Sequence, residues 1–177
     1  FKKKMIHYIK IYDLIGFKIC WIACAFSTKW GNPYLGPIIT LVFILLHLII
    51  VQFNLRDIKI ISLALLIGLV IDSFFLKFNL IHYQGGILVT FNLAPLWILS
   101  MWAGFAVTLL YTLQSIKDRY FISGLLGFIG GPLSYNAGVQ IGSVIINGSI
   151  AYFTLALTWG IIIPFLFYII NQFESNV

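Results

Sequence analysis

Asp72 and Lys18 are ionisable residues inside apolar runs of this sequence. Asp72 stands in the run LLIGLVIDSFFL, and Lys18 stands in the apolar stretch that begins near Tyr8. A charged side chain at the centre of a bilayer costs at least about 3 kcal/mol on insertion scales, so it is expected to face the protein interior or to have a partner. Two interpretations follow: a buried Lys18–Asp72 ion pair that fixes helix packing, or a proton-binding or ligand-binding site at Asp72.

Four polar residues follow one another at helical spacing in the fifth apolar run: Asn136, Gln140, Ser143 and Asn147. Spacings of four, three and four place these side chains on one face of a helix. Such groups would lack hydrogen-bond partners if they faced lipid, so we expect them to face other helices or a cavity. They therefore predict either hydrogen bonding between helices or one wall of a binding site, together with Asp72 and His82.

Small residues occupy another face of the same run. Gly127 and Gly131 are four residues apart, as are Gly138 and Gly142. This spacing is typical of helices whose backbones approach closely. We expect these glycines to serve helix packing, either within the chain or against a partner membrane protein.

Sequence motifs for common cofactors and metals are absent. The sequence has no phosphate-binding loop, dinucleotide fingerprint, G-x-S-x-G elbow or H-E-x-x-H pair. His7, His47 and His82 do not share a helix at metal-ligand spacing, and a lone histidine in a span is more often a hydrogen-bonded structural residue. We therefore predict neither a cofactor nor a metal site.

Six apolar runs must position these residues. Only 9% of the residues are charged, whereas a soluble domain averages about 25%. A helix of about 20 apolar residues crosses the hydrocarbon layer. The sequence therefore predicts an all-α bundle of six transmembrane helices in a single integral membrane domain over residues 1–177. The predicted spans cover about 8–26, 37–53, 58–76, 95–113, 120–145 and 150–170.

The basic residues indicate how the bundle is oriented. They are frequent before the first run and in every second loop after it, at Lys2, Lys3, Lys4, Lys10, Arg56, Lys59, Lys117 and Arg119. The remaining loops contain only Lys29 and Lys77. Because cytoplasmic loops are enriched in Lys and Arg, both termini are predicted to be cytoplasmic. The net charge of +6 is spread over short loops, which suits anionic lipid headgroups and argues against nucleic acid.

The longest predicted loop, from Lys77 to Ala94, has paired glycines at its centre. Gly85 and Gly86 separate two β-prone runs, and paired glycines permit the positive φ angles of a tight turn. The loop is expected to cover the outer mouth of the bundle. It would do so either as a short β-hairpin or as a re-entrant loop.

Several of these residues also occur in a known family. Asp72, the sequence APLW at Ala94–Trp97 and the segment GLLGFIGGPLSYNAGVQIG at Gly124–Gly142 resemble a family of small bacterial inner-membrane proteins. That family is catalogued only as a domain of unknown function. The resemblance covers most of the chain and implies a bacterial inner-membrane location. It supplies no catalytic residue.

Three functions are compatible with these features. The favoured one is binding or transport of a small or lipid-like molecule in a polar cavity of the bundle. The second is an intramembrane lipid-modifying enzyme with Asp72 and His82 in acid–base roles. The third is an accessory subunit of a membrane complex whose interface is the glycine face.

Overall fold

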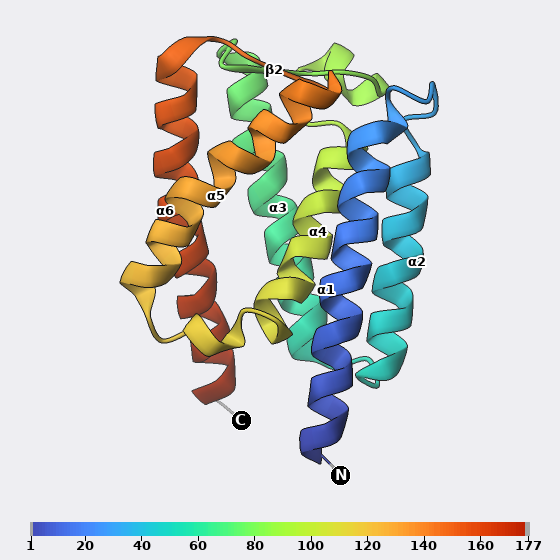
Figure 1. Cartoon of the computed structure of the whole chain (residues 1–177), viewed down its shortest axis with the longest axis vertical. Coiled ribbons are helices and arrows are strands. Elements are labelled where there is room, and N and C mark those ends of the chain that lie inside the picture. The colour runs from blue at the N-terminus through green and yellow to red at the C-terminus, as the bar shows by residue number, and fades with distance from the viewer. Residues whose placement is uncertain (1, 176–177) are drawn as a thin grey trace.

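The computed structural model describes residues 2–175, with side chains from residue 8 to residue 174, so the side chains of Lys2, Lys3 and Lys4 lie outside the description. The predicted all-α class is confirmed: the described residues form six α-helices (Figure 1). Their bounds are α1 (Lys2–Ser27), α2 (Leu35–Ile50), α3 (Leu55–Lys77), α4 (Leu96–Tyr111), α5 (Tyr120–Ile141) and α6 (Gly148–Ser175).

Helix α4 lies at the centre of one half of the bundle. It packs against α1, α2 and α3, and small residues at Ala103, Gly104 and Ala106 let those helices approach it closely. Helices α5 and α6 form a closely packed pair, and α5 runs obliquely across the bundle towards the upper part of α1 (Figure 1). The start of α1 and the end of α6 lie at the same end of the bundle, the termini end.

A short sheet lies at the opposite end, the strand end. Strand β1 (Ile81–Tyr83) pairs antiparallel with β2 (Val144–Ile146), with Ile81 opposite Ile146. The predicted hairpin around Gly85 and Gly86 is therefore wrong. These glycines, at φ of 72° and 93°, lead into a 3₁₀ helix, η1 (Ile87–Phe91), and the partner of β1 comes from beyond α5. The connection lies across the strand end and does not turn back between the helices as a re-entrant loop would (Figure 1).

Helix α5 is shorter than predicted because Gly142 terminates it. Gly142 has a φ of +86°, and its N–H donates to the carbonyls of Gly138 and Val139. This left-handed conformation is a common helix end that suits glycine. Ser143 and Asn147 consequently lie beyond the helix, and the predicted polar face is not continuous.

Two described helices are long and apolar enough to cross a membrane, namely Leu55–Lys77 and Gly148–Glu174. Helices α2 and α4 are also apolar but have 16 residues each. Such a helix is about 24 Å long, which is shorter than the roughly 30 Å hydrocarbon layer. Six helices are thus present, whereas length and hydropathy together identify two candidate spans.

Candidate functional site

Asp72 lies in a fully buried cage of hydrogen-bond donors at the strand end of α3. Tyr83 and Tyr135 each donate to its Oδ1 at 2.5 Å, and the indole of Trp102 donates to its Oδ2 at 2.6 Å. The three donors come from β1, α5 and α4. The Asp72 cage therefore joins four elements at one carboxyl group.

A glycine on α3 makes room for one of these donors. Gly68 precedes Asp72 by one helical turn, and a Cβ atom there would lie 2.3 Å from the Trp102 ring. Only a residue without a side chain lets the indole lie flat against α3 and reach Asp72. The contact therefore depends on glycine at position 68 of α3 and on tryptophan at position 102 of α4.

The Asp72 cage satisfies the carboxyl group without a cation. Burial and the nearby Asp72 charge raise the pKa of the Tyr83 phenol well above its usual value, so this hydroxyl keeps its proton and donates it in the hydrogen bond. Lys18 is exposed, and none of the described ion pairs includes it or Asp72. The predicted Lys18–Asp72 pair is therefore wrong, because aromatic donors occupy the positions that a lysine would need.

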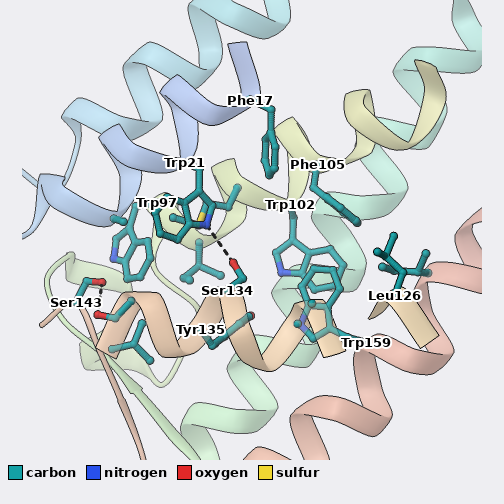
Figure 2. Close-up of a pocket in the computed structure, with 18 residues that line it drawn as sticks. Phe17, Trp21, Trp97, Trp102, Phe105, Leu126, Ser134, Tyr135, Ser143 and Trp159 are labelled. Carbon is teal, nitrogen blue, oxygen red and sulfur yellow. Dashed lines mark hydrogen bonds between the residues drawn. The ribbon is translucent and has the colours of Figure 1, made fainter. Parts of the chain in front are cut away.

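A cavity of about 230 Å³ lies beside the Asp72 cage, and Figure 2 shows the residues that line it. Trp102 and Tyr135 belong to both, since each lines the cavity and donates to Asp72. Trp159 of α6 stacks on Trp102 with ring centroids 4.6 Å apart. Aromatic side chains dominate the wall, and they are Phe17, Trp21, Trp97, Trp102, Phe105, Tyr135 and Trp159.

Helices α1 and α5 meet across the cavity at one hydrogen bond. The Trp21 indole donates to the Ser134 hydroxyl at 3.1 Å, as the dashed line in Figure 2 marks. Ser134 is exposed and Trp21 is half-buried. The contact therefore lies where the cavity reaches the surface between α1 and α5.

One buried polar atom of the cavity-lining residues lacks a well-formed hydrogen bond. The indole nitrogen of Trp159 is buried and makes no well-formed hydrogen bond with the described residues, although it interacts with the Tyr135 phenol. A buried N–H group without an acceptor is costly. Trp159 is therefore a donor whose requirement the described residues meet only in part.

The predicted polar residues are spread over several places. Asn136 accepts a hydrogen bond from Tyr152 at 3.0 Å, Gln140 is exposed, and Asn147 donates to the Asn79 carbonyl at 2.6 Å.

Only Ser143 among these residues lines the cavity, and its hydroxyl donates to the Gly138 carbonyl at 3.1 Å. His82 is half-buried on β1, opposite Ile145. The polar wall expected from the sequence is not formed, because α5 ends at Ile141. Aromatic residues line the cavity instead.

Two of the four predicted packing glycines lie against α6. A Cβ atom on Gly127 would lie 2.2 Å from the Trp159 carbonyl oxygen, and one on Gly131 would lie 2.4 Å from the Trp159 ring. Gly138 instead faces Val144 of β2, and Gly142 ends the helix. The first two glycines thus bring Trp159 into the cavity wall.

A second buried polar cluster, at the termini end, was not predicted as a site. Asp13, His47 and Asp57, here called the Asp–His–Asp trio, are fully buried on α1, α2 and α3. His47 Nδ1 lies 3.1 Å from Asp13 Oδ1, and Nε2 lies 3.4 Å from Asp57 Oδ2. Asp13 lies inside an apolar run just as Lys18 does, so the criterion applied to Lys18 could have found it.

The trio continues towards the surface through Arg56. Arg56 Nε donates to Asp57 at 3.0 Å, its Nη1 donates to Glu174 at 2.9 Å, and Lys117 also pairs with Glu174. The Tyr111 hydroxyl donates to Asp57 at 2.6 Å. No group of three or more His, Cys, Asp or Glu residues suited to a metal occurs in the described part of the chain.

Comparison with known proteins places the chain in a family. Neither the curated proteins nor the solved structures gave a match. A family model described as "Protein of unknown function (DUF2878)" matches residues 10–165, which include all members of the Asp72 cage and of the Asp–His–Asp trio. The family predicted from Asp72, APLW and the Gly124–Gly142 segment is confirmed, and the chain belongs to the DUF2878 family.

Proposed function

We propose that this protein is a multi-pass protein of the bacterial inner membrane that binds a lipid-like molecule in its aromatic cavity. The observation that supports this proposal most directly is the cavity of about 230 Å³ lined by seven aromatic side chains. Ligand pockets are typically concave and mostly apolar, with few polar groups that orient the ligand.

The outer surface favours a membrane location for all six helices. Large apolar side chains are exposed on several sides of the bundle, among them Leu41, Val42, Leu45, Leu66, Val70, Leu125, Leu133, Phe153 and Ile161. Soluble monomers rarely expose contiguous apolar patches above a few hundred Å². Lipid would cover these side chains, and local thinning of the bilayer accommodates helices as short as α2 and α4.

The size of the cavity restricts the ligand. Its 230 Å³ lies below the range of about 300–1,000 Å³ that is usual for drug-sized ligands. A single hydrocarbon chain or a small ring system fits, whereas a whole phospholipid does not. The rest of an amphiphile would leave between α1 and α5 past Trp21 and Ser134, and one acceptor oxygen of the ligand would satisfy the Trp159 N–H group.

Binding accounts for the geometry better than the two other functions. Asp72 is not among the cavity-lining residues, and its hydrogen bonds hold Trp102 and Tyr135 in the wall, which is a positioning role. Gly127 and Gly131 contact α6, so this glycine pair is used within the chain and does not form an interface with another subunit.

Mass spectrometry of small molecules that copurify with the full chain tests the proposal. Gly130 lines the cavity, and a Cβ atom there would have no neighbour within 4 Å, so Gly130→Leu fills space that the ligand needs. The matched control is Ile129→Leu at the adjacent position, where the side chain is 52% exposed. Wild type and the control should retain one enriched apolar molecule, and Gly130→Leu should reduce it by about tenfold, equivalent to about 1.4 kcal/mol.

Two results would contradict binding in the cavity. One is a lipid profile identical to that of the bulk membrane in the wild-type protein. The other is equal retention of the enriched molecule by Gly130→Leu and the wild type.

A further inference from the structure

The Asp–His–Asp trio opposes both nitrogens of one imidazole with carboxyl oxygens. A neutral imidazole has one N–H donor and one acceptor nitrogen, and an ionised carboxylate only accepts. With neutral His47 and two ionised carboxylates, one nitrogen lone pair would therefore face a carboxylate oxygen at 3.1 or 3.4 Å. One additional proton removes this conflict, on either the imidazole or one of the carboxyl groups.

The charges around the trio agree with one bound proton. Asp13, Asp57 and Glu174 contribute three negative charges, while Arg56 and Lys117 contribute two positive charges. A single added proton makes the connected group neutral. Without it, a net negative charge remains at three fully buried residues, which is strongly unfavourable.

Asp13 gives an independent indication of the same proton. Its Oδ2 atom is buried and has no hydrogen-bond partner among the described residues, so His47 is the main group that stabilises this carboxylate. The groups that contact His47 are Asp13 of α1, Asp57 of α3 and the ring of Tyr111 of α4, and Arg56 adjoins them through its hydrogen bonds to Asp57 and Tyr111. Lys59 lies over the Phe173 ring instead, 5.4 Å from its centroid.

The trio is connected to the cavity through one face of α1. Asp13, Phe17 and Trp21 follow one another at intervals of four residues, so they lie along the same side of the helix. Phe17 and Trp21 line the cavity, and Asp13 ties this side of α1 to α2 through His47.

We propose that Asp13, His47 and Asp57 form a proton-binding site whose occupancy fixes α1 as the wall of the aromatic cavity. The proton exchanges with water at the termini end, where the partly exposed Arg56, which keeps its charge, links Asp57 to Glu174. When the proton leaves, the Asp13–His47 contact weakens and α1 with Trp21 is released from α2. Proton binding stands without the ligand proposal, because it is measured at His47 itself.

Protonation can be measured on the full chain in lipid nanodiscs. With His7 and His82 replaced by Gln, His47 is the only histidine, and nitrogen NMR reports its ring protons while infrared spectroscopy reports protonated carboxylic acids. At neutral pH we expect either two protonated ring nitrogens, or one together with a protonated carboxylic acid. A neutral imidazole with no protonated carboxyl group in the trio would overturn the proposal, and this measurement needs no change within the trio.

Asp13→Asn provides the matched test. It removes one negative charge, so the group is neutral without the extra proton, and the loss of that proton from His47 or Asp57 is expected. Asp118→Asn is the control, because Asp118 is exposed and accepts a hydrogen bond only from Asn171 in the described structure. An unchanged proton count in Asp13→Asn, if this variant is folded, would contradict the assignment.

The link to α1 has a separate readout. Quenching of Trp21 by brominated lipids, taken as the difference between the wild type and Trp21→Phe, should rise as the trio loses its proton. Quenching that does not change with pH would refute the coupling to the cavity and leave the proton count as an independent result.

Discussion

At Asp72, two phenols and one indole provide the hydrogen bonds that a cation would otherwise provide. All three donors belong to side chains that also pack as large apolar groups, and two of them line the cavity. Removing one donor from a buried carboxylate leaves part of its desolvation cost unbalanced. A single substitution of Trp102 or Tyr135 is therefore expected to change both the hydrogen bonding of Asp72 and the wall of the cavity.

Tyr135→Phe should lower the free energy of unfolding by about 1–3 kcal/mol, because it removes one of the two hydroxyl donors to Asp72 Oδ1. Tyr152→Phe is the control, since its hydroxyl also bonds one helix to another but joins α6 to the half-buried Asn136 of α5. Unfolding in detergent mixtures gives both values. Equal losses in the two variants would mean that the hydrogen bond from Tyr135 to Asp72 contributes no more to the free energy of unfolding than the hydrogen bond from Tyr152 to Asn136.

Ser134→Ala should leave stability within about 0.5 kcal/mol of wild type, because Ser134 is exposed. It removes the acceptor of the Trp21 indole, so Trp21 should become more accessible to quenchers dissolved in the bilayer. Fluorescence quenching measures the change, with Ser100→Ala as the control because the hydroxyl of the half-buried Ser100 bonds, among the described residues, to the Leu96 carbonyl of its own helix. Unchanged quenching would show that the hydrogen bond does not restrain Trp21.

At the scale of the elements, the sequence predicted helices far better than their ends and partners. Apolar runs of sufficient length identify helices because the hydrophobic pattern is local. The end of α5 was misplaced because the sequence alone does not distinguish a glycine that packs from one, like Gly142, that adopts positive φ. The partner of β1 could not be predicted, since β2 follows only after two intervening helices.

Asp72 illustrates the same limit within one site. Its burial follows from an apolar run, but its donors come from residues 11, 30 and 63 positions away. Tyrosine and tryptophan also occur throughout the apolar runs, so their role as donors depends on the tertiary arrangement. The predicted partner Lys18 was the obvious charge in the sequence, whereas the actual partners have no formal charge.

Gly127→Ala should destabilise the contact between α5 and α6. The added methyl group would lie 2.2 Å from the Trp159 carbonyl oxygen, and overpacking of this kind costs about 1–3 kcal/mol. Gly130→Ala on the same helix meets nothing within 4 Å and should be neutral or stabilising by about 0.5–1 kcal/mol. Thermal unfolding compares the two, and equal stability would contradict the close approach at Gly127.

At the scale of the whole molecule, six helices return the chain to the end where it starts. The starts of α1, α3 and α5 lie at this termini end and the ends of α1 and α3 at the strand end (Figure 1). In or next to the first group of segments are Lys10, Arg56, Lys59, Lys117 and Arg119, and in or next to the second are Lys29 and Lys77. This asymmetry, together with the positive-inside rule, underlies the proposed orientation.

Reporter fusions test that orientation. A fluorescent protein fused after Val177 should be active, and alkaline phosphatase fused there should be inactive, because the proposal puts this end in the cytoplasm. Phosphatase inserted between Gly85 and Gly86 should give the opposite result, since this loop belongs to the strand end. Phosphatase activity at the C-terminus would reverse the orientation.

The pairing of β1 with β2 has a consequence for how the protein is made. Because β2 follows α5, the ribosome must synthesise α4 and α5 before β1 can find its partner. Tyr83, the last residue of β1, can then join Tyr135 and Trp102 at Asp72 only late in folding. Chains truncated before β2 should therefore lack the strand pairing that holds Tyr83 at Asp72, and we expect them to be degraded faster than the full chain.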